Sequence, residues 1–113
     1  MMDRNEKCLA ITDADFPRAA AAYAWVDAGG ELVVEYRREN VRSGLEETVR
    51  RAVVDAEEIV KMAAYYRVTV NELPAMLDEA CGVGYATTLS EVERAFGDAL
   101  EVILESGANY KFK

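Results

Sequence analysis

Apolar residues recur at steps of three and four through most of the chain after Ser43, which is typical of helices that bury one side. The longest such stretch runs from 44 to 66 and opens with Ser43 and Glu46 in a capping-box pattern. Its apolar positions are Leu45, Val49, Val53, Ala56, Val60 and Ala63. We therefore predict one long amphipathic helix over residues 44–66.

Two further helices are predicted, over residues 70–81 and 90–106. Each opens with a hydroxyl residue three positions before a glutamate, and each is followed by a glycine that suits a helix end. The capping pairs are Thr69 with Glu72 and Ser90 with Glu93. In the third helix the spacing places five apolar residues on one buried side, namely Val92, Phe96, Ala99, Leu100 and Ile103.

The N-terminal part contains strand patterns. Residues 6–12 form a short apolar run, and in residues 32–36 the side chains of Leu32, Val34 and Tyr36 share one side. The tail, "NYKFK", alternates in the same way and permits a short edge strand.

Residues 15–28 allow two structures. Asp15 can cap a helix, Pro17 suits its first turn, and Gly29–Gly30 can end it. In the alternative, "AYAWV" pairs with "LVVEY" across the turn "DAGGE" as a hairpin. We favour the helix because four consecutive alanines are poor strand formers.

These elements together predict a helix-rich α+β fold, in which a small two- or three-stranded sheet packs with three C-terminal amphipathic helices. The length suits one compact domain over residues 1–113. The longest apolar run is far shorter than the roughly 20 residues of a membrane helix, and the polar start does not resemble a secretory signal. We therefore expect a cytoplasmic protein that does not enter a membrane.

The negative charge is concentrated in one part of the chain. The formal net charge is −8, and residues 71–105 hold eight acidic side chains against the single base Arg94. This balance disfavours direct binding to nucleic acid, because neutralisation of phosphates requires an excess of Lys and Arg. It favours a protein partner with a basic surface and leaves homo-oligomers open.

The sequence offers little for catalysis. Histidine is absent, which removes the commonest general base and metal ligand. Cys8 and Cys81 belong to no C-x-x-C pair and are expected to be reduced thiols. The G-x-G of "CGVGYATTLSEVE" lacks the Lys of a phosphate loop, and acidic residues follow it, so it is expected to join two helices. We expect no enzymatic activity, no cofactor and no metal site.

The predicted helices carry a candidate surface for the partner. On the third helix, four acidic residues fall on one outward side at steps of three and four. Two more lie seven residues apart on the preceding helix. The six candidate partner-binding residues are Glu72, Glu79, Glu91, Asp98, Glu101 and Glu105.

One segment resembles a known family. In "EIVKMAAYYRVTVNELPAML", Glu58–Leu77, an aliphatic helix is followed by Val, a hydroxyl residue and a Glu-Leu helix, as in the closing helices of Cro/C1-type repressors. The resemblance implies a transcriptional regulator. The chain departs from the family because no Gln-bearing helix-turn-helix precedes the segment, and Arg67 stands where the pattern usually has Gly.

The function expected from these features is binding to another macromolecule, as an adaptor, regulator or inhibitor. Two alternatives follow from the charge and the resemblance. The first is an acidic inhibitor or nucleic-acid mimic of the kind that mobile elements use against host defences. The second is a transcriptional regulator with a degenerate Cro/C1-like helical segment.

Overall fold

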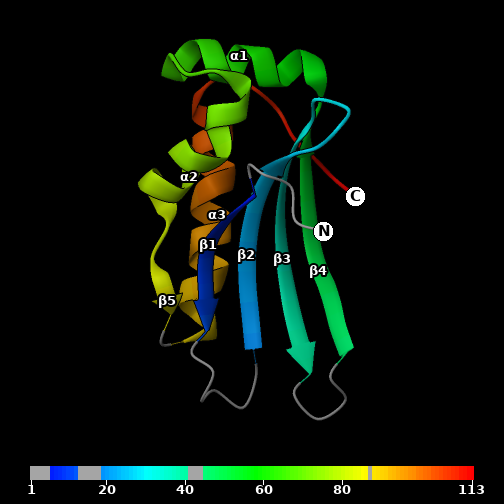
Figure 1. Ribbon diagram of the computed structural model, residues 1–113, viewed down its shortest axis with the longest axis vertical. Helices are drawn as coiled ribbons and strands as arrows, with labels where there is room; N and C mark the ends of the chain where they lie inside the picture. The colour runs from blue at the N-terminus through cyan, green and yellow to red at the C-terminus, as the bar shows by residue number, and fades with distance from the viewer. Residues whose placement is uncertain (1–5, 13–18, 41–44, 87) are drawn as a thin grey trace.

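The protein has two layers, a six-stranded sheet and a layer of helices (Figure 1). The structure is a computed structural model that describes residues 6–12, 19–40, 45–86 and 88–113, with side chains described at all of these except 39–40, 45–49 and 85–86. The strands are β1 (Lys7–Thr12), β2 (Ala19–Val26), β3 (Leu32–Asn40), β4 (Leu45–Val54), β5 (Gly84–Ala86) and β6 (Lys111–Phe112). The helices are α1 (Ala56–Tyr66), the 3-10 turn η1 (Val70–Glu72), α2 (Leu73–Cys81) and α3 (Leu89–Glu105).

The sheet is built on a meander in the order β5-β1-β2-β3-β4-β6. Strands β1 to β4 pair antiparallel with their neighbours in sequence, β6 pairs antiparallel with β4, and β5 pairs parallel with β1. Helices α2 and α3 pack on one face of this sheet, and α1 lies across its upper end in Figure 1.

The turn between β2 and β3 is fixed by Asp27. Its carboxylate accepts hydrogen bonds from the backbone N–H groups of Gly29 and Glu31, at 2.9 and 3.0 Å. Gly30 has a φ of 79°, a left-handed conformation that glycine adopts without steric cost. The sequence DAGGE thus closes the hairpin, the alternative that its turn pattern allowed and that the four alanines disfavoured.

The predicted helix over residues 15–28 is wrong, because residues 19–26 form the central strand β2. The proposed cap Asp15 and the first-turn Pro17 lie outside the described residues. Tertiary packing overrides the weak strand preference of alanine here. Ala20, Ala22 and Ala24 are buried on the helix-covered face, where their small side chains let α2 and α3 approach the sheet closely.

The predicted helix over residues 44–66 is wrong in its first half. Residues 45–54 form strand β4, and the helix begins only at Ala56. A step of four residues is an even number, so apolar residues at that spacing also share one face of a strand. Val53 and Val54 are β-branched and suit the strand, and pairing with β3 satisfies their backbone. The proposed capping residue Ser43 lies outside the described residues.

The sheet is therefore larger than predicted, with six strands where two or three were expected, although the class remains α+β. Strand β1, strand β6, the helical segment from Val70 to Cys81 and helix α3 lie where the sequence placed them. Thr69 and Glu72 form the predicted capping box. The predicted cap Ser90 is corrected to Thr88, whose hydroxyl accepts a hydrogen bond from the N–H of Glu91.

The core lies between the sheet and the helices. Strand β3 contributes Leu32, Val34 and Tyr36, the three residues whose alternation predicted a shared side. All five apolar residues predicted to be buried in α3 are buried. The ring centroids of Tyr36 and Phe96 lie 6.2 Å apart across this interface, so an aromatic contact joins the two layers.

Candidate functional site

The six predicted partner-binding residues are found on the helical layer. Glu72 closes η1, Glu79 lies in α2, and the other four lie in α3. All are exposed except Glu91, which is half-buried. Helices α2 and α3 pack side by side, so the acidic positions of both belong to one side of the molecule.

Two of the six carboxylate residues have roles in helix capping. The carboxylate of Glu72 accepts a hydrogen bond from the N–H of Thr69 at 2.9 Å, which holds the pKa of Glu72 below its ordinary value. Glu91 lies in the first turn of α3, where a negative charge favours the helix dipole. The positions of these two carboxylates are thus partly explained by local structure.

The remaining four, Glu79, Asp98, Glu101 and Glu105, form what we call the acidic helix face. The side-chain hydrogen bonds and ion pairs found among the described residues involve none of these four. Two nearby groups sense their charge. Burial, with Asp98 as the second cause, raises the pKa of the Cys81 thiol to about 11. Burial and then Glu105 likewise raise the pKa of Tyr66.

The glycine motif joins the two helices through a short strand. Gly82 ends α2, and the N–H of Val83 donates a hydrogen bond to the carbonyl of Leu9 at 2.9 Å. Strand β5 then pairs with β1 before α3 begins. Gly82 precedes the strand and Gly84 is its first residue, whereas a phosphate loop places its glycines between a strand and the following helix.

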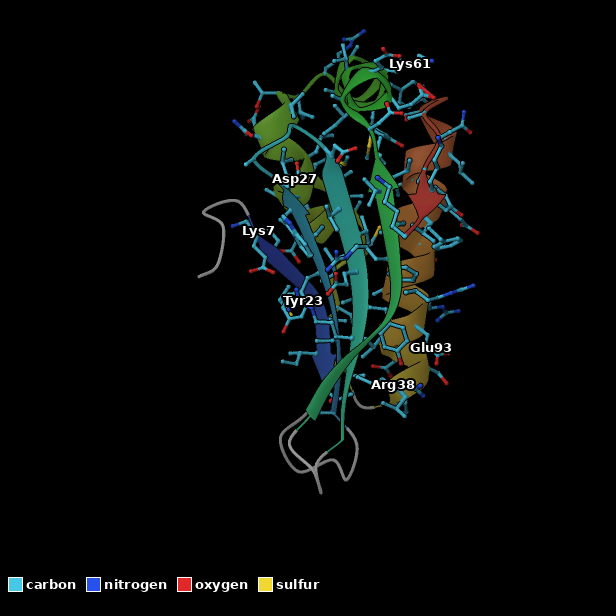
Figure 2. All side chains as sticks on the ribbon, turned by 90° about the vertical axis from the view of Figure 1, so that its right-hand side faces the viewer. Lys7, Tyr23, Asp27, Arg38, Lys61 and Glu93 are labelled. Atoms are coloured by element: carbon cyan, nitrogen blue, oxygen red, sulfur yellow. The ribbon has the colours of Figure 1, made fainter. Side chains whose placement is uncertain are left out.

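The other face of the sheet carries a second feature, which the sequence patterns did not predict. We call it the open sheet face, since no helix or strand in the described part of the chain covers it. In Figure 2, Tyr23 lies on this side of the sheet, while Arg38 and Glu93 lie on the opposite side next to α3. The register assigns to it Cys8, Ile11, Ala19, Ala21, Tyr23, Trp25, Val33, Glu35, Arg37, Arg51 and Val53.

A buried carboxylate organises the centre of this face. The side chain of Glu35 is only 1% exposed, and its two carboxylate oxygens accept hydrogen bonds from Arg37 and Arg51. A guanidinium nitrogen of Arg37 also lies 3.8 Å from a carboxylate oxygen of Glu6. The central carbon of the Arg37 guanidinium lies 4.5 Å from the ring centroid of Tyr23 and 5.5 Å from that of Trp25, which adds cation–π attraction. The cluster is therefore charge-paired and ordered.

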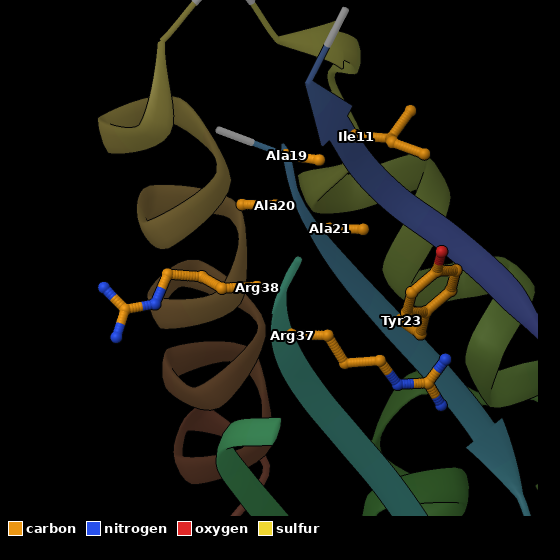
Figure 3. A pocket seen from close by; sticks show the side chains of 7 residues that line it. All are labelled: Ile11, Ala19, Ala20, Ala21, Tyr23, Arg37 and Arg38. Atoms are coloured by element: carbon orange, nitrogen blue, oxygen red, sulfur yellow. The ribbon is translucent and has the colours of Figure 1, made fainter. Parts of the chain in front are cut away.

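A small hollow of about 70 Å³ lies beside this cluster. Ala19 and Ala21 contribute only methyl groups to it, while Ile11, Tyr23 and Arg37 have larger side chains that rise around them. Figure 3 shows Tyr23 and Arg37 pointing to the same side of the sheet and Arg38 pointing to the other. The hollow is large enough for part of one side chain, and too small for a cofactor.

The sequence signal for this face was the alternation of β3 together with the hairpin alternative for residues 22–26. Because Leu32, Val34 and Tyr36 share one side of β3, the alternation places Glu35 and Arg37 on the opposite side, where the structure has them. The roles of Tyr23 and Trp25 were missed because their strand was predicted as a helix. The role of Arg51 was missed for the same reason, because the residues of β4 were also predicted as a helix. Pairing across strands brings Arg51 opposite Glu35, 16 residues away in sequence.

Other kinds of site find little support. The described residues contain no group of three or more acidic or Cys side chains placed to hold a metal ion. Within the same residues no helix has the length and apolar character needed to cross a membrane. Cys8 and Cys81 are free thiols.

Comparison with known proteins finds no matching family model, no matching curated protein and no matching solved structure. The function must therefore be argued from the two surfaces of this chain.

Proposed function

We propose that this chain is a small, cytoplasmic, non-enzymatic protein that binds a protein partner with a basic surface through the acidic helix face. The observation that carries the proposal is the exposure of Glu79, Asp98, Glu101 and Glu105 on two helices packed side by side. Carboxylates that stabilise a fold are usually paired or cap a helix, as Glu35 and Glu72 do here. These four instead lie toward solvent.

The electrostatics suit fast and salt-sensitive association. The negative charges gathered on this surface attract a basic partner over about a Debye length, near 8 Å at physiological ionic strength. Such attraction mainly raises the association rate and selects against acidic partners. The partner class that fits is therefore a protein with clustered Lys and Arg.

A narrower form of this proposal is an acidic inhibitor that occupies the nucleic-acid-binding groove of its partner. On α3, Asp98, Glu101 and Glu105 follow one another at steps of three and four, which spaces neighbouring positions roughly 5–6 Å apart. A row of carboxylates at this spacing presents a line of negative charge, as a phosphate backbone does. Competition with duplex DNA for the captured partner tests this form.

The segment that resembles Cro/C1-type repressors forms α1, η1 and α2. The described residues before it form four strands of the sheet. The likeness is thus confined to the local arrangement of these helices, and it adds no support to a role in transcription.

The test is charge reversal on the acidic helix face. Partners captured from lysate by the unaltered protein are identified by mass spectrometry, and their association rates are then measured over a range of salt concentrations. We expect Asp98→Lys combined with Glu101→Lys and Glu105→Lys to slow association at low salt by about tenfold or more, while the circular dichroism spectrum stays unchanged.

A pair of single variants provides the matched control. Glu101→Lys and Glu57→Lys change the net charge equally, but Glu57 lies on α1 and outside the acidic helix face. Only Glu101→Lys should slow association. Equal effects of the two variants would show that net charge alone attracts the partner, and no effect of the triple variant would refute the proposal.

A further inference from the structure

Strand β2 is apolar on both of its faces. Ala20, Ala22 and Ala24 point into the core, while Ala19, Ala21, Tyr23 and Trp25 point to the open sheet face. An antiparallel sheet with one face in water normally alternates apolar and polar residues. Strands that are apolar on both sides are typical of sheets covered on both sides.

The residues of this face are also those favoured in protein interfaces. Tyr, Trp and Arg are enriched there, and the guanidinium of Arg37 lies over the rings of both Tyr23 and Trp25. The partly exposed Ile11 lies beside them. These side chains are held by the Glu35 cluster and would lose little freedom on binding.

The charge distribution indicates which occupant fits. Glu6 and Glu35 balance Arg37 and Arg51, so the ion cluster of the face is neutral. A polyanion such as nucleic acid requires an excess of positive charge that this cluster lacks. A second copy, which carries the same net charge of −8, would meet least repulsion here, because the acidic helix face lies in the other layer.

The shape of the face is complementary to itself. Tyr23 and Trp25 form a ridge on β2, and Ala19 and Ala21 form the floor of the hollow on the same strand. A two-fold axis near Ala22 would place the ridge of each copy over the hollow of the other, as an isologous interface requires. The molecule measures 42 by 23 Å in the plane of Figure 1. These dimensions, which include α1 and the loops, set the upper limit for the area of the face, and a standard interface buries roughly 800 Å² per partner.

We propose that two copies of this chain associate through their open sheet faces, with the Tyr23–Trp25 ridge of each copy seated on the Ala19–Ala21 floor of the other. The resulting assembly places the two acidic helix faces outward, on opposite sides.

The first test measures the mass of the full chain in solution by sedimentation over a range of protein concentrations. We expect a monomer–dimer equilibrium that Trp25→Lys weakens at least about tenfold, because it places a charge at the centre of the interface. The control, Val60→Lys, replaces an apolar residue that is 60% exposed on α1 and should leave the equilibrium unchanged.

A measurement without any variant guards against loss of folding in Trp25→Lys. Trp25 is the single tryptophan, so its emission reports on this face alone. Dilution of the unaltered protein should shift the emission to longer wavelength as the dimer dissociates.

Three results would overturn the proposal. The first is a monomer at all concentrations with constant emission. The second is a dimer that Val60→Lys disrupts and Trp25→Lys does not. The third is a monomer whose Trp25 emission is quenched by oligothymidylate, which would assign the face to single-stranded nucleic acid, with bases stacked on the rings.

Discussion

At the scale of single residues, Glu35 stands out because it is the buried charged group on which the open sheet face is built. A buried carboxylate is costly unless it is paired. Burial alone would raise the pKa of Glu35, but the hydrogen bonds and positive charges of Arg37 and Arg51 outweigh it and hold the pKa below the ordinary value of 4.5. The folded state therefore favours the ionised form.

This lowered pKa fixes how stability depends on pH. The contribution of Glu35 is fully present above its ordinary pKa and is lost as the pH falls through the lower pKa of the folded state. Glu35→Gln should lower the free energy of unfolding by about 2 kcal/mol near neutral pH, because hydrogen bonds to a charged group are lost. Arg51 is 44% exposed and can be rehydrated, which limits the loss.

Denaturant titrations of the parent and of Glu35→Gln, near neutral pH and at about pH 3, check this prediction. The difference between the two proteins should shrink in acid, because Glu35 takes up its proton more readily in the unfolded chain than in the folded state. A difference that is the same at both pH values would mean that the carboxylate charge contributes nothing.

At the scale of elements, the boundary between β4 and α1 shows how local signals compete. Asp55 ends the strand and caps the helix, its carboxylate accepting hydrogen bonds from the N–H groups of Glu57 and Glu58 at 3.1 and 2.9 Å. The N-terminus of α1 thus falls within the stretch that the sequence predicted as one continuous helix.

Substitution of Asp55 distinguishes the two structures. In the structure described here, Asp55→Ala removes the cap and should lower the free energy of unfolding by about 0.5–2 kcal/mol. Asp55→Asn retains a capping oxygen and should cost at most a few tenths of a kcal/mol. Were residue 55 inside a continuous helix, Asp55→Ala would instead stabilise the protein, because alanine has the higher helix propensity. Thermal or chemical unfolding of the two variants decides between them.

The elements also show what the sequence could predict and what it could not. Helix α3 was predicted well because its apolar spacing, Gly107 and acidic outer side all indicate the same structure. Strands β2 and β4 were not predicted, because an alanine-rich pattern and a step of four residues each fit a helix as well as a strand. Only pairing with neighbouring strands in the sheet decides between the two. The acidic positions follow from helical spacing alone, so their placement on the helices could be predicted. The Glu35–Arg51 pair depends on strand register, which local patterns do not reveal.

At the scale of the whole molecule, the two layers differ in chemistry. The helical layer carries the exposed carboxylates of the acidic helix face, and the sheet carries aromatic rings and paired charges. Pairing of two copies through the sheet would leave the helical layers free. A dimer would then present two equal acidic surfaces. A partner that offers two or more basic sites within reach of both surfaces would be bound more tightly by the dimer than by one copy alone.

Association of this kind links stability to protein concentration, which gives a prediction independent of any partner. If unfolding separates two copies, each tenfold rise in total concentration stabilises the folded dimer by about 1.4 kcal/mol. For a chain of this size the unfolding temperature should then rise by a few degrees. Trp25→Lys should abolish the dependence, and Val60→Lys should preserve it. Calorimetric scans at several concentrations measure this directly. A midpoint that does not move with concentration in the unaltered protein would show that the open sheet face stays exposed in the folded state, and that the apolar outer side of β2 has no second copy to cover it.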